Sequence, residues 1–132
     1  MLQNKLFKTF FCAIVVSGAV YMIDNIFHLF YSIMWFDMVM HFLGGFSVSM
    51  FALLILIIKR KNFSYGQMLF WGVTSAFVFG IIWELFELYF GMTYLYSHDY
   101  IGDNGMDVTM DVTGGLLAVW YGYYKLRNFK TY

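Results

Sequence analysis

The 132-residue chain contains no proline, one cysteine and few charged residues, which make up 12% of its length. A single cysteine excludes an internal disulfide bond and a metal site built from several cysteines. Without proline, no helix is kinked by one, which disfavours transporters built on broken helices. Hydrophobic residues make up 61% of the chain, which excludes disorder and argues against a soluble domain, because so short a chain cannot bury that much apolar surface.

Four long apolar stretches contain most of the hydrophobic residues. They cover about residues 6–31, 36–58, 68–90 and 107–124. A membrane-spanning helix takes about 20 apolar residues, and the alternating short strands of a membrane barrel are absent. The first stretch starts like a signal peptide, but it is too long and lacks a cleavage site, so we predict a retained helix. The sequence thus predicts the all-α class: a polytopic membrane protein in which residues 1–132 form one transmembrane domain, a four-transmembrane-helix bundle.

Basic residues are missing from most of the chain. All eight fall near the N-terminus (Lys5 and Lys8), in residues 59–61, or in residues 125–130. Cytoplasmic segments of membrane proteins are enriched in Lys and Arg, so these three segments and both termini are predicted to be cytoplasmic. All eight acidic residues then lie in the outer loops or in the outer halves of the helices.

Each predicted helix contains a pair of ionisable residues three or four positions apart. The pairs are Asp24/His28, Asp37/His41, Glu84/Glu87 and Asp107/Asp111. This spacing puts both members of a pair on one helix face, and the helical rise puts all four pairs at a similar depth. Small residues continue several of these faces, which lets helices approach closely in lipid. We therefore expect the acidic faces to meet inside the bundle, although Asp24 and His28 could also satisfy each other within the first helix.

The second and fourth predicted helices share one pattern. In each, an Asp is followed four positions later by His41 or Asp111, and then by a pair of glycines at residues 44–45 or 114–115. Each of these helices also follows a helix with an ionisable pair. The pattern favours two pseudo-repeated helix pairs with the functional centre between them. The paired glycines favour helix packing over ligand binding.

The predicted cluster combines six carboxylates and two histidines without any Lys or Arg in the outer half. Like charges in a low-dielectric environment cannot all stay ionised, so either several groups are protonated or bound cations neutralise them. Bundles that hold two metal ions use about four carboxylates and two histidines. Oxygen-rich ligands suit Mg, Mn, Ca or Fe, and Zn also fits. The predicted metal ligands are Asp24, His28, Asp37, His41, Glu84, Glu87, Asp107 and Asp111.

Three short motifs give the chain a family resemblance. They are Asp37-x-x-x-His41-Phe42, Trp83-Glu84-x-x-Glu87 and Asp107-x-x-x-Asp111-x-x-Gly114. Over about residues 36–118 the chain resembles the VanZ-like family of small bacterial membrane proteins, and more closely its inner-membrane relatives of unknown function with a W-E-x-x-E segment. The resemblance implies a bacterial cytoplasmic (inner) membrane protein with an outward-facing site, since the VanZ name comes from resistance to teicoplanin, whose target lies outside the membrane.

The chain departs from the VanZ-type pattern at three positions. Met38, Glu87 and Asp111 stand where Lys, Gln and Asn are usual. The chain is therefore more acidic than the pattern it resembles, and the resemblance implies no particular reaction.

The first functional hypothesis is a metal-binding protein that acts on or senses a lipid or a lipid-linked cell-envelope component at the outer leaflet. It includes a metal-dependent membrane hydrolase or transferase, in which the metal ion acts as a Lewis acid or activates a water molecule. His41, Glu84 and Asp107 are the predicted catalytic residues. Whether the protein is an enzyme stays open at this point.

Two other hypotheses remain. A transporter, channel or sensor for protons or divalent cations would use the acidic residues as a relay, although no acidic residue continues such a path toward the cytoplasm. So short a transporter would require a homo-oligomer. A non-catalytic accessory membrane subunit would use the carboxylates to bind a structural ion. Membrane lipids are the expected partners, and nucleic acid is not expected because no basic patch exceeds three residues.

Overall fold

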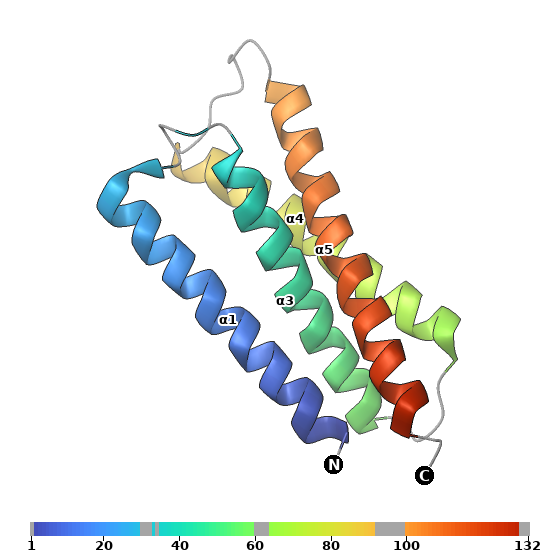
Figure 1. Cartoon of the computed structure of the whole chain (residues 1–132). Coiled ribbons are helices and arrows are strands. Elements are labelled where there is room, and N and C mark those ends of the chain that lie inside the picture. The colour runs from blue at the N-terminus through green and yellow to red at the C-terminus, as the bar shows by residue number, and fades with distance from the viewer. Residues whose placement is uncertain (1, 30–32, 34, 60–63, 92–99, 130–132) are drawn as a thin grey trace.

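The computed structural model describes residues 2–29, 33, 35–59, 64–91 and 100–129. Over these residues the chain consists of four long helices, as the sequence predicted (Figure 1). They are α1 (Leu2–Phe27), α3 (Phe36–Lys59), α4 (Tyr65–Phe90) and α5 (Tyr100–Phe129). The all-α fold class is confirmed.

The beginning and end of α4 are set by local hydrogen bonds. Ser64 forms a capping box with Gln67: the Ser64 hydroxyl accepts from the Gln67 amide at 3.2 Å, and the Gln67 side chain accepts from the Ser64 amide at 3.1 Å. Gly91 ends the helix in the left-handed conformation, with φ 69°. The predicted start at residue 68 was three residues late because the capping residues are polar and lie outside the apolar stretch.

The other helix limits differ from prediction where polar residues occur. α1 ends at Phe27, and His28 has a positive φ of 52°, so the predicted continuation to residue 31 is wrong. α5 begins at Tyr100 instead of residue 107. Asp103 lies in its first turn, where a negative charge interacts favourably with the helix dipole and stabilises the helix. Part of the predicted outer loop 91–106 is therefore helical, while residues 92–99, including His98 and Asp99, lie outside the described residues.

The helices form one central group of three and one peripheral helix. α3 and α5 run parallel and side by side, and α4 crosses both of them (Figure 1). α1 packs mainly against α3, touches α5 slightly, and makes no contact with α4 among the described residues. The start of α1 at Leu2 and the end of α5 at Phe129 lie at the same end of the bundle, together with the end of α3 at Lys59 (Figure 1).

Three helices are long and apolar enough to cross a membrane: Gln3–Asp24 in α1, and α3 and α4 over their full lengths. Many large apolar side chains point outward, including Phe7, Phe11 and Ile82, as expected for surfaces in contact with lipid. α5 is less apolar, since it includes Asp107 and Asp111, but both of these residues are buried against the other helices. These two carboxylates of α5 therefore face the interior of the bundle.

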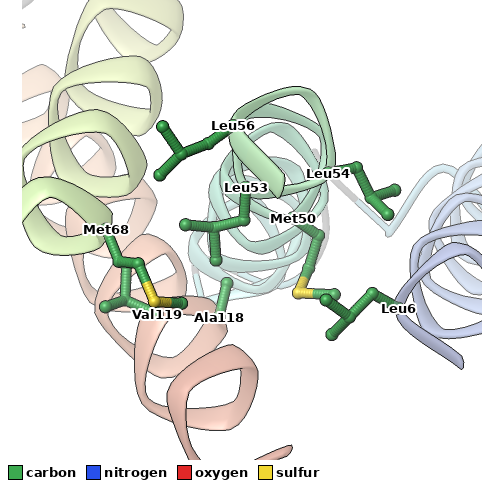
Figure 2. Close-up of a cluster of buried hydrophobic side chains, with 8 residues drawn as sticks. All are labelled: Leu6, Met50, Leu53, Leu54, Leu56, Met68, Ala118 and Val119. Atoms are coloured by element: carbon green, nitrogen blue, oxygen red, sulfur yellow. The ribbon is translucent and has the colours of Figure 1, made fainter. Parts of the chain in front are cut away.

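The hydrophobic core lies toward the end of the bundle where α1 and α4 begin and α3 ends. Figure 2 shows its eight buried side chains. Leu6 of α1 meets Met50 of α3, while Leu53 of α3 points toward Met68 of α4 and Val119 of α5. This arrangement leaves the opposite half of α3, α4 and α5 for the acidic residues.

Glycines allow α3 and α5 to approach backbone to backbone. A Cβ atom added at Gly45 would collide with the backbone of Asp111, and one added at Gly114 would collide with the carbonyl oxygen of Phe42. The prediction that the paired glycines serve helix packing is confirmed at these positions. The two repeated patterns thus face each other. The flanking helices break the repeat, because α4 packs extensively against both α3 and α5, whereas α1 packs against α3 and touches α5 only slightly.

Candidate metal centre

Three helices supply the residues of the acidic cluster. α3 provides Asp37 and His41, α4 provides Glu84 and Glu87, and α5 provides Asp107 and Asp111. All of them except Asp37 are at least nine-tenths buried, and Asp37 is partly exposed, with 20% of its side chain accessible. The helical spacing puts each pair on the face that its helix turns toward the other two.

His41 lies at the centre of the cluster. Its Nδ1 atom is hydrogen-bonded to Asp111 Oδ2 at 2.8 Å. Its Nε2 atom faces Glu84 Oε1 at 3.5 Å and Asp37 Oδ1 at 3.6 Å. These two distances are longer than hydrogen bonds, so the two sides of the imidazole ring have different surroundings.

Two buried atoms of this cluster have no hydrogen-bond partner among the described residues: His41 Nε2 and Glu84 Oε1. Native proteins seldom leave such atoms unpaired, because an unsatisfied buried polar group costs about 1–3 kcal/mol. Here the two atoms lie 3.5 Å apart. This is the observation that separates the cluster from an ordinary set of interfacial acids.

The cluster offers the atoms that a cation would need. Asp37, His41 and Asp107 each have one candidate ligand atom, and these three atoms all lie within 4.8 Å of one another. Glu87 and Asp107 are also close enough to interact electrostatically with Glu84 and Asp37. None of the described Lys and Arg residues neutralises these carboxylates, because all of them lie near the opposite end of the bundle. They are Lys5, Lys8, Lys59, Lys125 and Arg127.

The Trp-Glu-x-x-Glu segment of α4 has an internal hydrogen bond that sequence reasoning missed. The indole N–H of Trp83 donates to Glu87 Oε1 at 2.8 Å. The Trp83 ring also stacks with Phe86, with 5.4 Å between ring centroids. The i, i+4 spacing of Trp83 and Glu87 was the available signal, since it places the two side chains on one face of a helix.

Asp111 occupies a space bounded by glycines of two other helices. A Cβ atom added at Gly80 of α4 would come within 2.6 Å of Asp111 Oδ2, and one added at Gly44 of α3 would lie 3.7 Å from Oδ1. Any larger residue at position 80 would therefore displace the Asp111 carboxylate. The sequence showed these glycines on the correct faces but did not show which side chain they make room for.

The structure does not bring Asp24 and His28 into the cluster. Among the described residues, the group that could hold a metal ion contains Asp37, His41 and Asp107 and no residue of α1. His28 is exposed just beyond the end of α1, and the helix itself lies to one side of the central three. Asp24 and His28 were predicted to join the cluster because they lie at the same depth in the membrane as the other pairs. Depth, however, does not determine which helices are neighbours.

These features define a helical membrane protein with a buried cluster of acidic residues and one histidine between three of its helices. The chain belongs to the family of predicted membrane proteins designated DUF2238, whose family model matches residues 3–128. No curated protein and no solved structure matches the chain. Nothing in these comparisons confirms the resemblance to the VanZ-like family, which stays a prediction.

Proposed function

We propose that the protein binds a divalent metal ion between α3, α4 and α5 and uses it at the outer face of the membrane on a lipid or lipid-linked substrate. His41 Nε2, Asp37 and Asp107 are the proposed ligands, with Glu84 as a fourth. The observation that supports this most strongly is the pair of buried, unpaired atoms, His41 Nε2 and Glu84 Oε1, which face each other. A cation between them would satisfy both.

The distances within the cluster suit metal ligands better than direct hydrogen bonds. Two ligand atoms that each lie about 2.1 Å from a tetrahedral metal ion are about 3.4 Å apart. His41 Nε2 is 3.5 Å from Glu84 Oε1 and 3.6 Å from Asp37 Oδ1. The mixture of carboxylates with one imidazole suits Zn²⁺, Mn²⁺, Fe²⁺ or Mg²⁺, and Ca²⁺ would need a wider arrangement.

The proposed substrate follows from the position of the cluster. Large apolar side chains of α4 next to Glu84 are exposed on the outside of the bundle, among them Leu85 and Phe86. A lipid could therefore lie directly against the helix that supplies a metal ligand. An anionic head group could approach the carboxylates only with a cation present, and the metal ion would then act as a Lewis acid or activate water for a hydrolase or transferase. In that case His41, Glu84 and Asp107 are the proposed catalytic residues.

The metal content of the purified protein tests this proposal. Protein extracted in detergent without chelator, dialysed and analysed by elemental mass spectrometry should contain close to one metal ion per chain. His41→Gln and Asp107→Asn should lose it. Asp103→Asn is the matched control, because Asp103 is an exposed acid on the same helix as Asp107. If wild-type protein holds no metal ion even after incubation with Zn²⁺, Mn²⁺ and Mg²⁺, the proposal is wrong.

A cation or proton transporter has less support. The fully buried Leu53, Met68 and Val119 fill the space between α3, α4 and α5 toward the termini, so an ion in the acidic cluster meets an apolar barrier there. A flux of protons or Mn²⁺ through proteoliposomes that depends on Asp107 would favour the transporter. A metal ion that is bound without any flux or reaction would favour a non-catalytic accessory subunit.

A further inference from the structure

Asp111 and the proposed metal ligands lie on opposite edges of the His41 ring. Asp111 Oδ2 is 2.8 Å from Nδ1, whereas Glu84 and Asp37 face Nε2. The two ring nitrogens point in different directions, so a carboxylate that is hydrogen-bonded to Nδ1 is turned away from an ion bound at Nε2.

We propose that Asp111 is a positioning residue that fixes the tautomer and the orientation of His41. This inference rests on the proposed function. The ionised Asp111 carboxylate accepts a hydrogen bond from the Nδ1–H of His41, which leaves the lone pair on Nε2 free to bind the metal ion. Histidine ligands of metal ions commonly donate their other N–H to a carboxylate in this way, and such a partner also increases the basicity of the ligand. The sequence pattern had suggested that Asp111 is itself a ligand.

The surroundings of Asp111 support a fixed position for its carboxylate. The residue is 1% exposed, and its backbone packs against the glycine backbone of α3 at Gly45. Gly80 of α4 leaves the space in which Asp111 Oδ2 lies. A ligand needs room to adjust to the metal ion, whereas a side chain held by two neighbouring helices can direct a ring with little freedom of its own.

The protonation of the two ring nitrogens tests the proposal directly. The variant His28→Gln/His98→Gln leaves His41 as the only histidine, so ¹⁵N-histidine labelling gives one set of ring signals in detergent micelles. With Zn²⁺ bound, we expect a metal-induced shift at Nε2 and a protonated Nδ1. Metal coordination at Nδ1 would overturn the proposal. This measurement uses the intact Asp111 and so does not depend on whether an Asp111 variant folds.

Affinity for Mn²⁺, followed by the loss of the electron paramagnetic resonance signal of the free ion, provides the second test. Asp111→Asn should bind Mn²⁺ about 10–100-fold more weakly than wild type, which is the usual effect of removing such a partner. Gly80→Ala should weaken binding in the same direction, although it touches no ligand, because its methyl group displaces Asp111 Oδ2. Gly105→Ala is the matched control on α5, since its Cβ atom would meet no side chain and no neighbouring helix within 4 Å among the described residues.

The outcomes separate the two proposals. If wild-type protein binds neither Zn²⁺ nor Mn²⁺, the proposed function fails. If wild type binds them through Nε2 but Asp111→Asn and Gly80→Ala bind equally well, the metal site stands and the role of Asp111 is wrong. In that case Asp111 would serve only the packing of α3, α4 and α5.

Discussion

Replacing Glu84 by Gln should stabilise the metal-free protein and at the same time abolish its response to metal ions. In the wild-type protein Glu84 Oε1 faces His41 Nε2 at 3.5 Å, and neither atom has a hydrogen-bond partner in the part of the chain that the structure describes. If Glu84 is ionised and the His41 proton is on Nδ1 in the metal-free protein, two acceptors face each other. A Gln side chain has the same shape, is uncharged, and can donate its amide N–H to Nε2 after a small rotation.

The size of the effect follows from the cost of the unpaired atoms. Removing one buried unsatisfied acceptor is worth about 1–3 kcal/mol. For a chain of this length 1 kcal/mol corresponds to roughly 3–5 °C in Tm. Glu84→Gln should therefore raise the Tm of the metal-free protein by about 3–15 °C. Wild type should instead gain about 2.7 kcal/mol from a metal ion present at 100 times its Kd, and the variant should gain almost nothing.

Thermal unfolding in detergent, measured once with chelator and once with Mn²⁺, checks both parts of this prediction. With chelator, the Tm of Glu84→Gln should be higher than that of wild type. With Mn²⁺, the difference between the two Tm values should disappear or change sign. The control Asp103→Asn removes an exposed carboxylate from the first turn of α5, and it should gain as much stability from Mn²⁺ as wild type does. A Glu84→Gln protein that is less stable than wild type with chelator, or that gains as much from Mn²⁺, would refute the reasoning.

Three further predictions follow from other contacts. Trp83→Phe removes the indole donor to Glu87 Oε1 while preserving the stacked ring, so it should lower stability by about 1–3 kcal/mol, measurable as a lower Tm; an unchanged Tm would contradict the importance of this hydrogen bond. Gly114→Leu places a side chain where a carbonyl oxygen of α3 now lies, and it should cost more than about 3 kcal/mol or abolish folding, as judged by size-exclusion chromatography; a monodisperse, equally stable variant would argue against the close approach of α3 and α5. In a chain otherwise free of cysteine, Asp103→Cys should react with an impermeant maleimide in intact bacteria, and Lys125→Cys should react only after permeabilisation; the reverse pattern would invert the proposed orientation.

The sequence alone determined the class of protein and the presence of its four long helices. Apolar stretches of about 20 residues identify membrane helices because hydrophobicity depends only on composition and length. It also placed Asp37, His41 and Asp107 on inward faces, since helical periodicity fixes which residues share a face. The end of α1 before His28 and the start of α5 at Tyr100 were missed, because the apolar pattern does not show whether the polar residues next to it are helical.

Only the tertiary structure decided which inward faces meet. Equal depth made Asp24 and His28 look equivalent to Asp37 and His41, but α1 packs to one side of α3 and does not reach α4 among the described residues. The spacing of residues also could not show that Asp111 contacts Nδ1 of His41 while Glu84 faces Nε2. Periodicity fixes a direction from one helix axis, whereas a site depends on how close and at what angle the neighbouring helices cross, and here glycine contacts between helices set that geometry.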